Sequence, residues 1–427
     1  MLAILVGTGV ASAAVVSVDF SRPVPARSVV GLLHGIDMKR PPDGMVTPLA
    51  PRWWRGDLSS APYKRVRGFG ARYIVVVSDL WGYPGANWYG RRPPWEDLDA
   101  WADFVRRLAD AHRGDRLVWD IWNEPDQPYF WNGTREQYYV TYRVAYEVLR
   151  RQLGPGAVIT GPSVSAFRWS WLVGLLEYCR GADCEVNALS WHELTSESGG
   201  ITRISDHLHR ARTLLLRNRS YVVLGLRELH INEVVGGGDY LYPGEQVAYL
   251  AELEHGHATL STRACWLDPS GVDNCQAHTL DGLLDPSSMR PRGPWWVTAW
   301  YARGVASRVW ARPLEGAVEV LAAARSPNRR RAEVLVGAFD PHDATAPATA
   351  TVGVDLAGVD RLRFARRRRY IGVAVYRVAN TGAAPTRPQA ISAQVVKVTR
   401  GTATVSVVMR PHEAMLLRLL PPGALRQ

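Results

Sequence analysis

A glutamate at the end of an apolar run is the first residue of this sequence whose type and position suit acid–base catalysis. Residues 117–126 read LVWDIWNEPD, so a strand-like stretch delivers Asn123 and Glu124 at its carboxyl end. Pro125 then ends the strand, because proline has no N–H to donate to a sheet. Neighbouring tryptophans would partly desolvate this glutamate and favour its protonated form, as a general acid requires. These tryptophans are Trp119, Trp122 and Trp131.

A second glutamate ends another apolar run. Residues 229–237 read LHINEVVGG, and Leu229, Ile231 and Glu233 share one strand face because side chains alternate along a strand with a period of two. Glu228 lies five positions before Glu233 and therefore points to the opposite face, which makes it the weaker candidate. We expect Glu233 at the carboxyl end of its strand, just before a glycine-rich loop.

Two such carboxyl groups facing each other have the chemistry needed to cleave a glycosidic bond. One protonates the leaving oxygen, and the other either attacks the anomeric carbon or activates a water molecule. A retaining enzyme holds the two groups about 5–5.5 Å apart, whereas an inverting enzyme holds them about 6.5–9.5 Å apart. A catalytically silent carbohydrate-binding protein would be expected to lack one of the two, and both are present in this chain.

Short apolar runs alternate with helical stretches from about residue 29 to residue 310. Strands that alternate with helices pair in parallel, and eight such units close into a (β/α)₈ barrel with its catalytic groups at the carboxyl ends of the strands. The expected strands are Val29–Leu33, Val46–Trp54, Arg72–Ser78, Arg116–Trp122, Ala157–Thr160, Val186–Trp191, Leu229–Glu233 and Arg263–Leu267, and the expected helices are Trp95–Ala111, Arg135–Gln152, Trp169–Tyr178, Ile201–Leu216 and Gly244–Thr259.

The pattern changes after Pro313, where short alternating runs are separated by Gly, Pro and Asn without an intervening helix. This pattern is typical of an antiparallel β-sandwich. The stretch Val15–Phe20 also alternates and could pair with the sandwich. We therefore expect a signal-peptide-like segment at 1–14, an N-terminal strand within 15–28, a catalytic barrel at 29–312 and a sandwich domain at 313–427.

The motif IWNEPD and the second glutamate resemble a known group of enzymes. The motif ends the fourth expected strand, Ser190-Trp191-His192 ends the sixth, and Glu233 ends the seventh. With the sandwich, these residues resemble the retaining glycosidases of glycoside hydrolase family 39, which include β-xylosidases, α-L-iduronidases and some endo-acting exopolysaccharide hydrolases. The resemblance implies Glu124 as acid/base, Glu233 as nucleophile, a carbohydrate substrate and no cofactor. It makes xylose- or arabinose-containing glycans the first expectation, although the sequence around Glu233 departs from the xylosidase and iduronidase patterns.

Further polar and aromatic residues at expected strand ends are candidates for substrate binding, each with a structural alternative. A histidine can simply be a satisfied core residue, Trp266 can be an ordinary core tryptophan, Asp79 can cap a loop, and Arg55 is better explained by a salt bridge to a neighbouring carboxylate. The full set of candidates is Asn123, His34, His192, Trp266, Arg55, Asp79, Trp81, Trp122 and Tyr240.

The chain is basic, with a net charge of +11, and its positive residues are spread along it with one dense run at Arg366–Arg369. A basic balance can indicate a nucleic acid or an anionic glycan as partner. No nucleic-acid motif such as a zinc-finger spacing accompanies the run, so we expect a solvated charged face and no nucleic-acid partner. A polyanion-binding protein is the alternative that this run leaves open.

Four cysteines form two tight pairs, Cys179 with Cys184 and Cys265 with Cys275. An even number of cysteines in closely spaced pairs predicts two disulfides and an oxidising compartment, with four unpaired thiols as the alternative. The first residues, MLAILVGTGVASAA, are apolar and resemble the end of a secretory signal, so we expect secretion and no integral membrane span. No metal site is expected, because HELTS at 192–196 lacks the second histidine of HExxH.

Overall fold

The computed structural model describes residues 13–58, 60–78, 93–194, 200–324, 331–340 and 349–426. These residues form two compact units. The barrel unit comprises the described parts of 27–241 and 252–292, and the sheet unit comprises those of 1–26, 242–251 and 293–427. Residues 242–251 and 293–312, which we expected in the catalytic barrel, thus cluster with the sheet.

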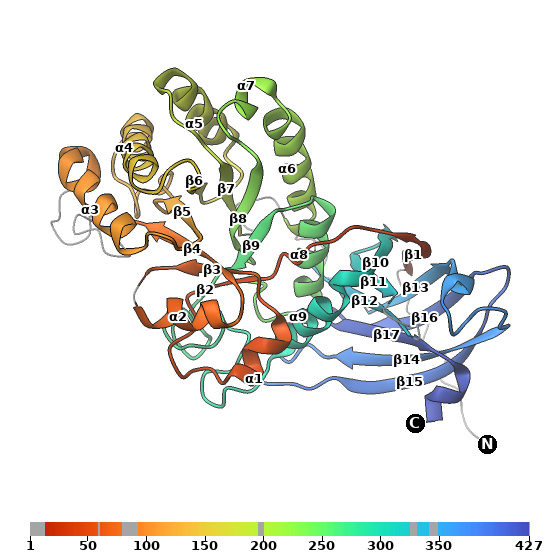
Figure 1. The fold of residues 1–427 in the computed structure, drawn as a ribbon. Coiled ribbons are helices and arrows are strands. Elements are labelled where there is room, and N and C mark those ends of the chain that lie inside the picture. Colours follow the sequence, from red (N-terminus) through yellow and green to blue (C-terminus); the bar gives the residue numbers. More distant parts are fainter. Residues whose placement is uncertain are drawn as a thin grey trace. The chain divides into compact units, whose positions relative to one another are not determined.

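Eight parallel strands close the barrel in sequence order from β2 to β9 (Figure 1). The expected (β/α)₈ fold is thereby confirmed. Most of the strands are continuous buried runs because the helices outside and the side chains inside leave neither face in water. The strands are β2 (Gly31–Leu33), β3 (Trp53–Gly56), β4 (Arg72–Val77), β5 (Leu117–Ile121), β6 (Val158–Val164), β7 (Ala188–Glu193), β8 (Glu228–Val234) and β9 (Leu260–Arg263).

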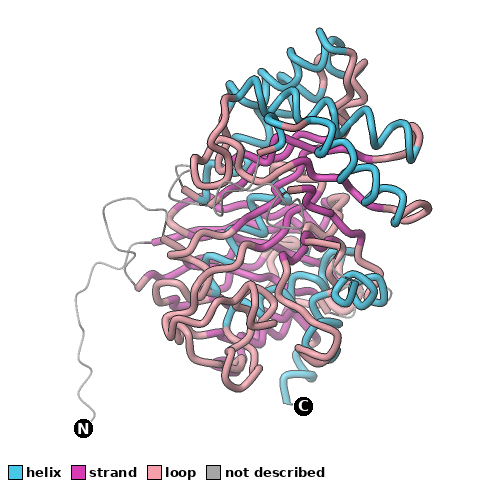
Figure 2. Tube along the Cα trace, turned by 90° about the vertical axis from the view of Figure 1, so that its left-hand side faces the viewer, coloured by secondary structure: helices cyan, strands magenta, loops and turns pink. Residues whose placement is uncertain are grey.

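Helices lie outside the strands of the barrel unit (Figure 2). The sequence sets where they begin: Asp97 accepts a hydrogen bond from Ala100 N at 3.0 Å, and Thr134 and Gln137 form a reciprocal capping box. The helices of the chain are α1 (Asp43–Val46), α2 (Ser60–Gly68), α3 (Leu98–Ala111), α4 (Arg135–Leu153), α5 (Trp169–Ala182), α6 (Ile204–Ala211), α7 (Arg219–Val222), α8 (Pro243–His255) and α9 (Gly293–Gly304).

Two barrel strands differ from the expectation. The second was expected over Val46–Trp54, but Val46 ends α1 and β3 begins only at Trp53, because Pro48 and Pro51 cannot donate to a sheet. The eighth was expected over Arg263–Leu267, but β9 ends where that range begins. The apolar residues that follow it belong to a loop closed by a disulfide.

The sheet unit is built on nine strands in the order β15-β14-β17-β12-β11-β10-β1-β13-β16. The pairing is antiparallel except between β1 and β13, which run parallel. Buried residues from most of these strands form one hydrophobic cluster, as expected for a sheet folded over itself into the sandwich. The strands are β1 (Ala13–Pro23), β10 (Arg308–Glu315), β11 (Val318–Ala324), β12 (Ala332–Ala338), β13 (Ala350–Ala357), β14 (Tyr370–Val378), β15 (Gln389–Lys397), β16 (Ala403–Met409) and β17 (Ala414–Leu420).

Both expected cysteine pairs are disulfide-bonded, Cys179 to Cys184 and Cys265 to Cys275. The second bond closes the long connection that follows β9. Among the helices in the described ranges, none combines the length and the apolar character needed to cross a membrane. Residues 1–12, which hold most of the expected signal-like segment, lie outside the described residues.

Candidate active site

The two candidate carboxylates converge at one end of the barrel. Glu124 follows β5, and Glu233 is the last residue but one of β8. Both therefore stand at the carboxyl ends of parallel strands. Three atoms lie within 4.8 Å of one another: a carboxylate oxygen of Glu124, a carboxylate oxygen of Glu233 and a ring nitrogen of His192. The side chains remain 12% and 16% exposed, so a molecule at the barrel mouth can reach both.

The backbone around Glu124 adopts a conformation that non-glycine residues rarely take. Trp122 has a φ of 72° and Glu124 a φ of 43°, both in the left-handed region. Such residues cost on the order of 1–3 kcal/mol each and persist only where the surroundings enforce them. Here the backbone N–H of Glu124 donates to the carbonyl of Ser163 at 2.9 Å, which ties the turn to β6. The carboxyl group is thus placed by a neighbouring strand.

A buried arginine holds Glu233. Arg55, on β3, is fully buried, and its Nη1 donates to Glu233 Oε1 at 2.8 Å. Its Nη2 donates to Asn123 Oδ1 at 2.8 Å, and its Nε donates to Asp120 Oδ2 at 2.9 Å. The structure therefore gives Arg55 the salt bridge that the sequence favoured. Its three bonded nitrogens are all engaged by protein groups, so direct substrate binding by Arg55 stays a prediction that this geometry does not support.

Asp120 is the residue of this network that sequence reasoning missed. It is fully buried and accepts hydrogen bonds from Ser163 Oγ at 2.5 Å and Asn232 Nδ2 at 2.8 Å, in addition to those from Arg55. Ser163 Oγ also lies 2.7 Å from Ser190 Oγ, so four strands meet at these polar side chains. A signal for it existed in the sequence: a charged residue inside a buried apolar strand requires a buried partner of opposite charge.

We predict that Arg55→Met lowers kcat/KM about 100-fold through loss of positioning. The same change removes the partner of Asp120 and Glu233 and so lowers the free energy of unfolding by about 3–5 kcal/mol. Steady-state kinetics and urea denaturation measure the two effects. Arg55→Lys restores the charge and should recover part of the stability, while Arg107→Met, on the exposed face of α3, should change neither quantity. Wild-type kinetics in Arg55→Met would show that the network has no role in positioning Glu233.

His192 links the two carboxylates electrostatically. Its Nδ1 donates to Glu124 Oε1 at 2.8 Å, and its ring is fully buried at the end of β7. Burial acts to lower the pKa of His192, but the charge of Glu233 and the hydrogen bond and charge of Glu124 outweigh it, so the pKa is raised. The imidazolium form is therefore favoured while both carboxyl groups are ionised, and less so when Glu124 carries a proton.

This shift predicts how the stability contributed by His192 depends on pH. A raised folded-state pKa means that the folded protein binds the proton more tightly than the unfolded chain does, so the stabilisation is complete below the unfolded value of about 6.5 and disappears as pH rises through the folded value. His192→Asn should therefore lower Tm more at about pH 5.5 than at about pH 9.5. Thermal unfolding at both pH values measures this. An equal loss at both would contradict the assignment of charge to His192, and His209→Asn on the exposed face of α6 provides the control.

His34 lies near the same carboxylate, at the end of β2. Burial lowers the pKa of His34 to about 4, although the negative charge of Asp57 acts against this shift. Glu233 also acts on it electrostatically, which places the imidazole close to that carboxylate. At neutral pH His34 is therefore uncharged, and it can exchange hydrogen bonds with a hydroxyl group without adding a charge.

A second carboxyl group near Glu233 was not anticipated. Asp281 is fully buried, and its Oδ2 accepts a hydrogen bond from Leu33 N at 2.6 Å. Burial raises the pKa of Asp281 well above its ordinary value. Burial thus favours the neutral form of Asp281, and its hydrogen bond with Leu33 ties the connection after β9 to the end of β2.

The remaining candidates divide by exposure. Trp122 is only 1% exposed, packs against Trp101 and Trp131 and donates its Nε1 to Phe130 O at 3.0 Å, so it lies in the core, away from any substrate. Tyr240 is buried too, with its hydroxyl 3.3 Å from Leu267 O. For both residues a contact with substrate stays a prediction that these packing contacts do not support.

Two candidates remain at the site, and two others cannot be placed. Asn123 lies beside Glu124, and its Oδ1 is occupied by Arg55. Trp266 is half-buried in the loop after β9, where its Nε1 donates to Val235 O at 3.0 Å and its ring covers Gly237. Asp79 and Trp81 lie outside the described residues.

The cluster of Glu124, His192 and Glu233 also has the donor types that can bind a divalent cation. The guanidinium of Arg55, 2.8 Å from Glu233, already compensates the charge of that carboxylate. A positive charge so close repels a cation, and a histidine in its imidazolium form cannot ligate a metal. The arrangement therefore fits paired carboxylates used in acid–base and nucleophilic chemistry better than it fits a metal centre.

Residues 87–215 match the family model of glycosyl hydrolases family 39. Solved structures give the fold: N2152 from Neocallimastix frontalis has a TM-score of 0.74 at 18% identity and covers 96% of this chain and 100% of its own. A GH39 enzyme from Xanthomonas axonopodis pv. citri scores 0.67 at 14% identity, with 98% and 99% covered. A monomeric β-xylosidase from Caulobacter crescentus CB15 scores 0.65 at 14% identity, with 95% and 99% covered.

The matched segment contains the motif that delivers Glu124 and the strand β7 that delivers His192. The barrel and the second, largely antiparallel sheet are the architecture that these solved structures share with the chain. Residues 87–215, less than a third of the chain, thus resemble glycoside hydrolase family 39, the family expected from the motif and the strand ends.

Proposed function

We propose that the protein is a retaining glycosidase in which Glu124 is the acid/base and Glu233 the nucleophile. The observation that carries the proposal is the approach of these two carboxylates to within 4.8 Å at the barrel mouth. That approach is nearer to the separation of about 5–5.5 Å used for retention than to the separation of about 6.5–9.5 Å used for inversion.

In the first step, Glu233 attacks the anomeric carbon. Arg55 holds Oε1 of Glu233, so Oε2 is the oxygen that forms the new C–O bond. As this bond forms, the glycosidic C–O bond breaks, and the leaving oxygen takes the proton of Glu124. The product of the step is a glycosyl ester on Glu233, and Glu124 is left as a carboxylate stabilised by the imidazolium of His192.

In the second step, the Glu124 carboxylate removes a proton from a water molecule. The water oxygen bonds to the anomeric carbon while the ester bond to Glu233 breaks, which restores both groups to their starting forms. Two displacements at one carbon leave its configuration unchanged. Arg55 stabilises the Glu233 carboxylate as it leaves, because the guanidinium stays in place throughout.

We assign the binding of the sugar to three further side chains. The amide nitrogen of Asn123 would donate to the ring hydroxyl next to the reacting carbon, since its oxygen is taken by Arg55. Neutral His34 would accept or donate at another hydroxyl. Trp266 would supply an aromatic face for the sugar's C–H groups, because its Nε1 is already satisfied by the backbone.

The substrate class that we propose is a xylose- or arabinose-containing oligo- or polysaccharide, or an exopolysaccharide cut internally. The solved β-xylosidase from Caulobacter crescentus, which shares the fold, supports the pentoside choice. We further propose that the protein is secreted, because two disulfides favour an oxidising compartment.

The test is turnover of an aryl glycoside panel that contains xyloside, arabinofuranoside, glucoside and iduronide, followed by NMR of the first-formed product. We expect the highest kcat/KM on a pentoside and a product with the anomeric configuration of the substrate. An inverted product would refute the nucleophilic role of Glu233. Binding of the sugars without turnover of any of them would favour the silent carbohydrate-binding alternative.

A further inference from the structure

The net charge of the chain is concentrated in one segment. Residues 359–400 contain ten Arg or Lys residues and a single acidic residue, Asp360, so this tenth of the chain accounts for nine of its eleven net positive charges. Elsewhere the basic residues are nearly balanced by acids. The sequence suggested positive charge spread along the chain with one solvated run, whereas the excess belongs to a defined part of the sheet unit.

Two connections bring these charges together at one end of the sheet. Val359 N donates to Gly401 O at 2.9 Å, and Val398 N donates to Arg369 O at 2.8 Å. The connection between β13 and β14 therefore runs beside the turn between β15 and β16. Exposed cations from both connections form what we call the basic surface: Arg361, Arg363, Arg366, Arg367, Arg368, Arg369, Lys397 and Arg400.

The charges of the basic surface are not neutralised within the described protein. None of its eight members takes part in an ion pair with another described residue, whereas arginines of the barrel unit commonly do, as Arg67 does with Asp115 at 2.8 Å. Asp360 packs against Gly401 as the one nearby acid of the segment. Eight unpaired cations on one small surface produce a strong local positive potential.

The basic surface rests on a well-packed base. Leu362, Phe364 and Ala365 alternate with the arginines and are buried in the sandwich core. Successive turns fix the backbone, since Ala365 N donates to Leu362 O at 2.9 Å and Arg368 N donates to Ala365 O at 3.0 Å. A ligand that binds here therefore has to order side chains only, which lowers the entropic cost of binding.

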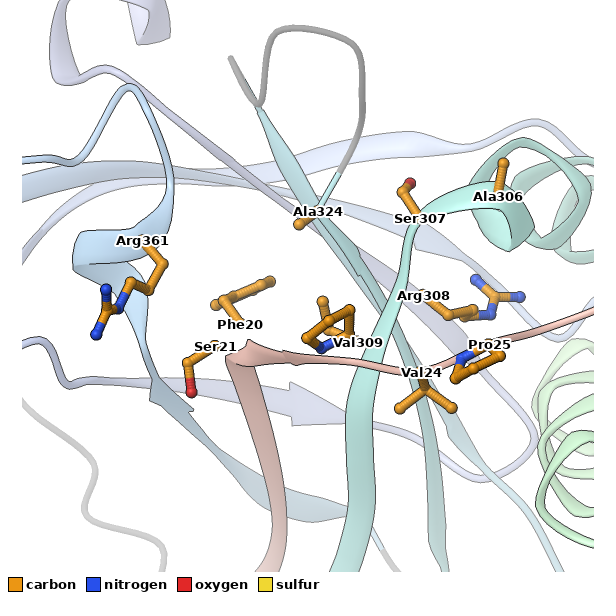
Figure 3. Close-up of a pocket in the computed structure, with 11 residues that line it drawn as sticks. Phe20, Ser21, Val24, Pro25, Ala306, Ser307, Arg308, Val309, Ala324 and Arg361 are labelled. Carbon is orange, nitrogen blue, oxygen red and sulfur yellow. The ribbon is translucent and has the colours of Figure 1, made fainter.

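A groove with a volume of about 760 Å³ adjoins the basic surface at Arg361 (Figure 3). Phe20, Val309 and Ala324 line it, and Pro23 at the end of β1 and Pro25 just after it form part of its wall. In Figure 3 the guanidinium of Arg361 points away from Phe20, toward the outside of the groove. The groove beside the charged surface exposes both apolar and polar groups, among them the hydroxyls of Ser21 and Ser307.

We propose that the basic surface and this groove bind an acidic polysaccharide, whose carboxylate or sulfate groups meet the arginines while its sugar rings lie in the groove. The choice of a glycan rests on the proposed function, since the same chain acts on glycans. Arginine binds such anions bidentately. A single-stranded nucleic acid would instead require several exposed aromatic rings for its bases, whereas Phe20 of the groove is buried in the core and Tyr370 is the one exposed ring within residues 359–400.

The binding experiment uses the full chain with polygalacturonate as the probe and pullulan as the uncharged polysaccharide. Chondroitin sulfate distinguishes sulfate from carboxylate recognition. Duplex DNA and phosphatidylglycerol vesicles are offered at equal charge concentration. We expect polygalacturonate or chondroitin sulfate to bind more tightly than DNA or vesicles, pullulan not to bind, and the affinity to fall linearly with salt on logarithmic axes.

The decisive variant replaces Arg366, Arg367, Arg368 and Arg369 by glutamine. We expect its affinity for the acidic polysaccharide to fall about tenfold or more at about 50 mM salt, with a shallower salt dependence. The matched control removes four exposed cations of the barrel unit, Arg107→Gln, Arg151→Gln, Arg217→Gln and Arg219→Gln, and should bind within about twofold of wild type. Ala306→Trp fills the groove and should weaken binding several-fold without changing the salt dependence.

Equal binding by the quadruple variant and wild type would overturn the proposal, as would a preference of wild type for DNA or for vesicles. Hydrolysis of a small aryl glycoside should be unchanged in both quadruple variants, because neither alters the barrel mouth. The readouts separate the two proposals: a chain that turns over no glycoside but binds polygalacturonate refutes the proposed function, and one that turns over glycosides but binds no acidic glycan refutes this inference.

Discussion

Glu233→Gln is expected to lower kcat on aryl pentosides by roughly 10⁴-fold or more, because an amide cannot act as the nucleophile. Glutamine has the shape of glutamate and still offers an oxygen to Arg55 Nη1, so the fold and the binding of substrate should survive. The loss should therefore appear in kcat, with KM changed little. Stopped-flow and steady-state kinetics, with circular dichroism as a check on folding, provide the measurement.

Glu228→Gln is the matched control for this experiment, since Glu228 occupies the other end of β8. It accepts a hydrogen bond from His230 Nε2 at 2.7 Å and has no contact with the barrel mouth. Its replacement should leave kcat within a few-fold of wild type. Comparable activity of Glu233→Gln and Glu228→Gln would show that β8 does not supply the nucleophile.

Glu124→Ala is expected to separate the two chemical steps. With an aryl glycoside whose leaving group needs no protonation, the glycosyl ester still forms, but water is no longer activated and its hydrolysis slows by roughly 10²–10⁴-fold. The ester should accumulate and be detectable by mass spectrometry as an adduct on Glu233. Azide, which attacks without general-base assistance, should restore turnover and yield a glycosyl azide of retained configuration.

The outcome that would contradict this role is a Glu124→Ala enzyme that hydrolyses good and poor leaving groups at wild-type rates or gains nothing from azide. Glu136→Ala serves as the control, because Glu136 is an exposed side chain in the first turn of α4. It should behave as wild type with and without azide. Loss of activity in both variants would point to a general effect of removing negative charge.

The predictable parts of the fold are the strands that are buried on both faces and the strands whose alternate residues are buried on one face. The run that became β4 is continuous and apolar because the barrel buries it on both faces, and sandwich strands such as β16 alternate because one face lies in the core. β15 carries no such signal, because it is an edge strand exposed along most of its length and burial leaves no pattern in QAISAQVVK.

Within the site, the ends of strands were predictable, but the direction of side chains was not. The carboxyl end of β5 follows from Pro125, which located Glu124 without any knowledge of its neighbours. Trp122 was expected at the substrate because it stands two residues earlier, yet a φ of 72° turns its ring into the core. The partners of Arg55 come from β5, the residues that follow it and β8, and pairing between strands remote in the sequence leaves no local signal.

The left-handed conformation at Trp122 and Glu124 has a consequence for heat resistance. A strained backbone turn relaxes when the contacts that enforce its conformation weaken. The hydrogen bond from Glu124 N to Ser163 O is one such contact. The barrel strands do not depend on that turn and should outlast it. Catalytic competence should therefore disappear on warming before the cooperative transition of the whole chain, as a local opening confined to the mouth.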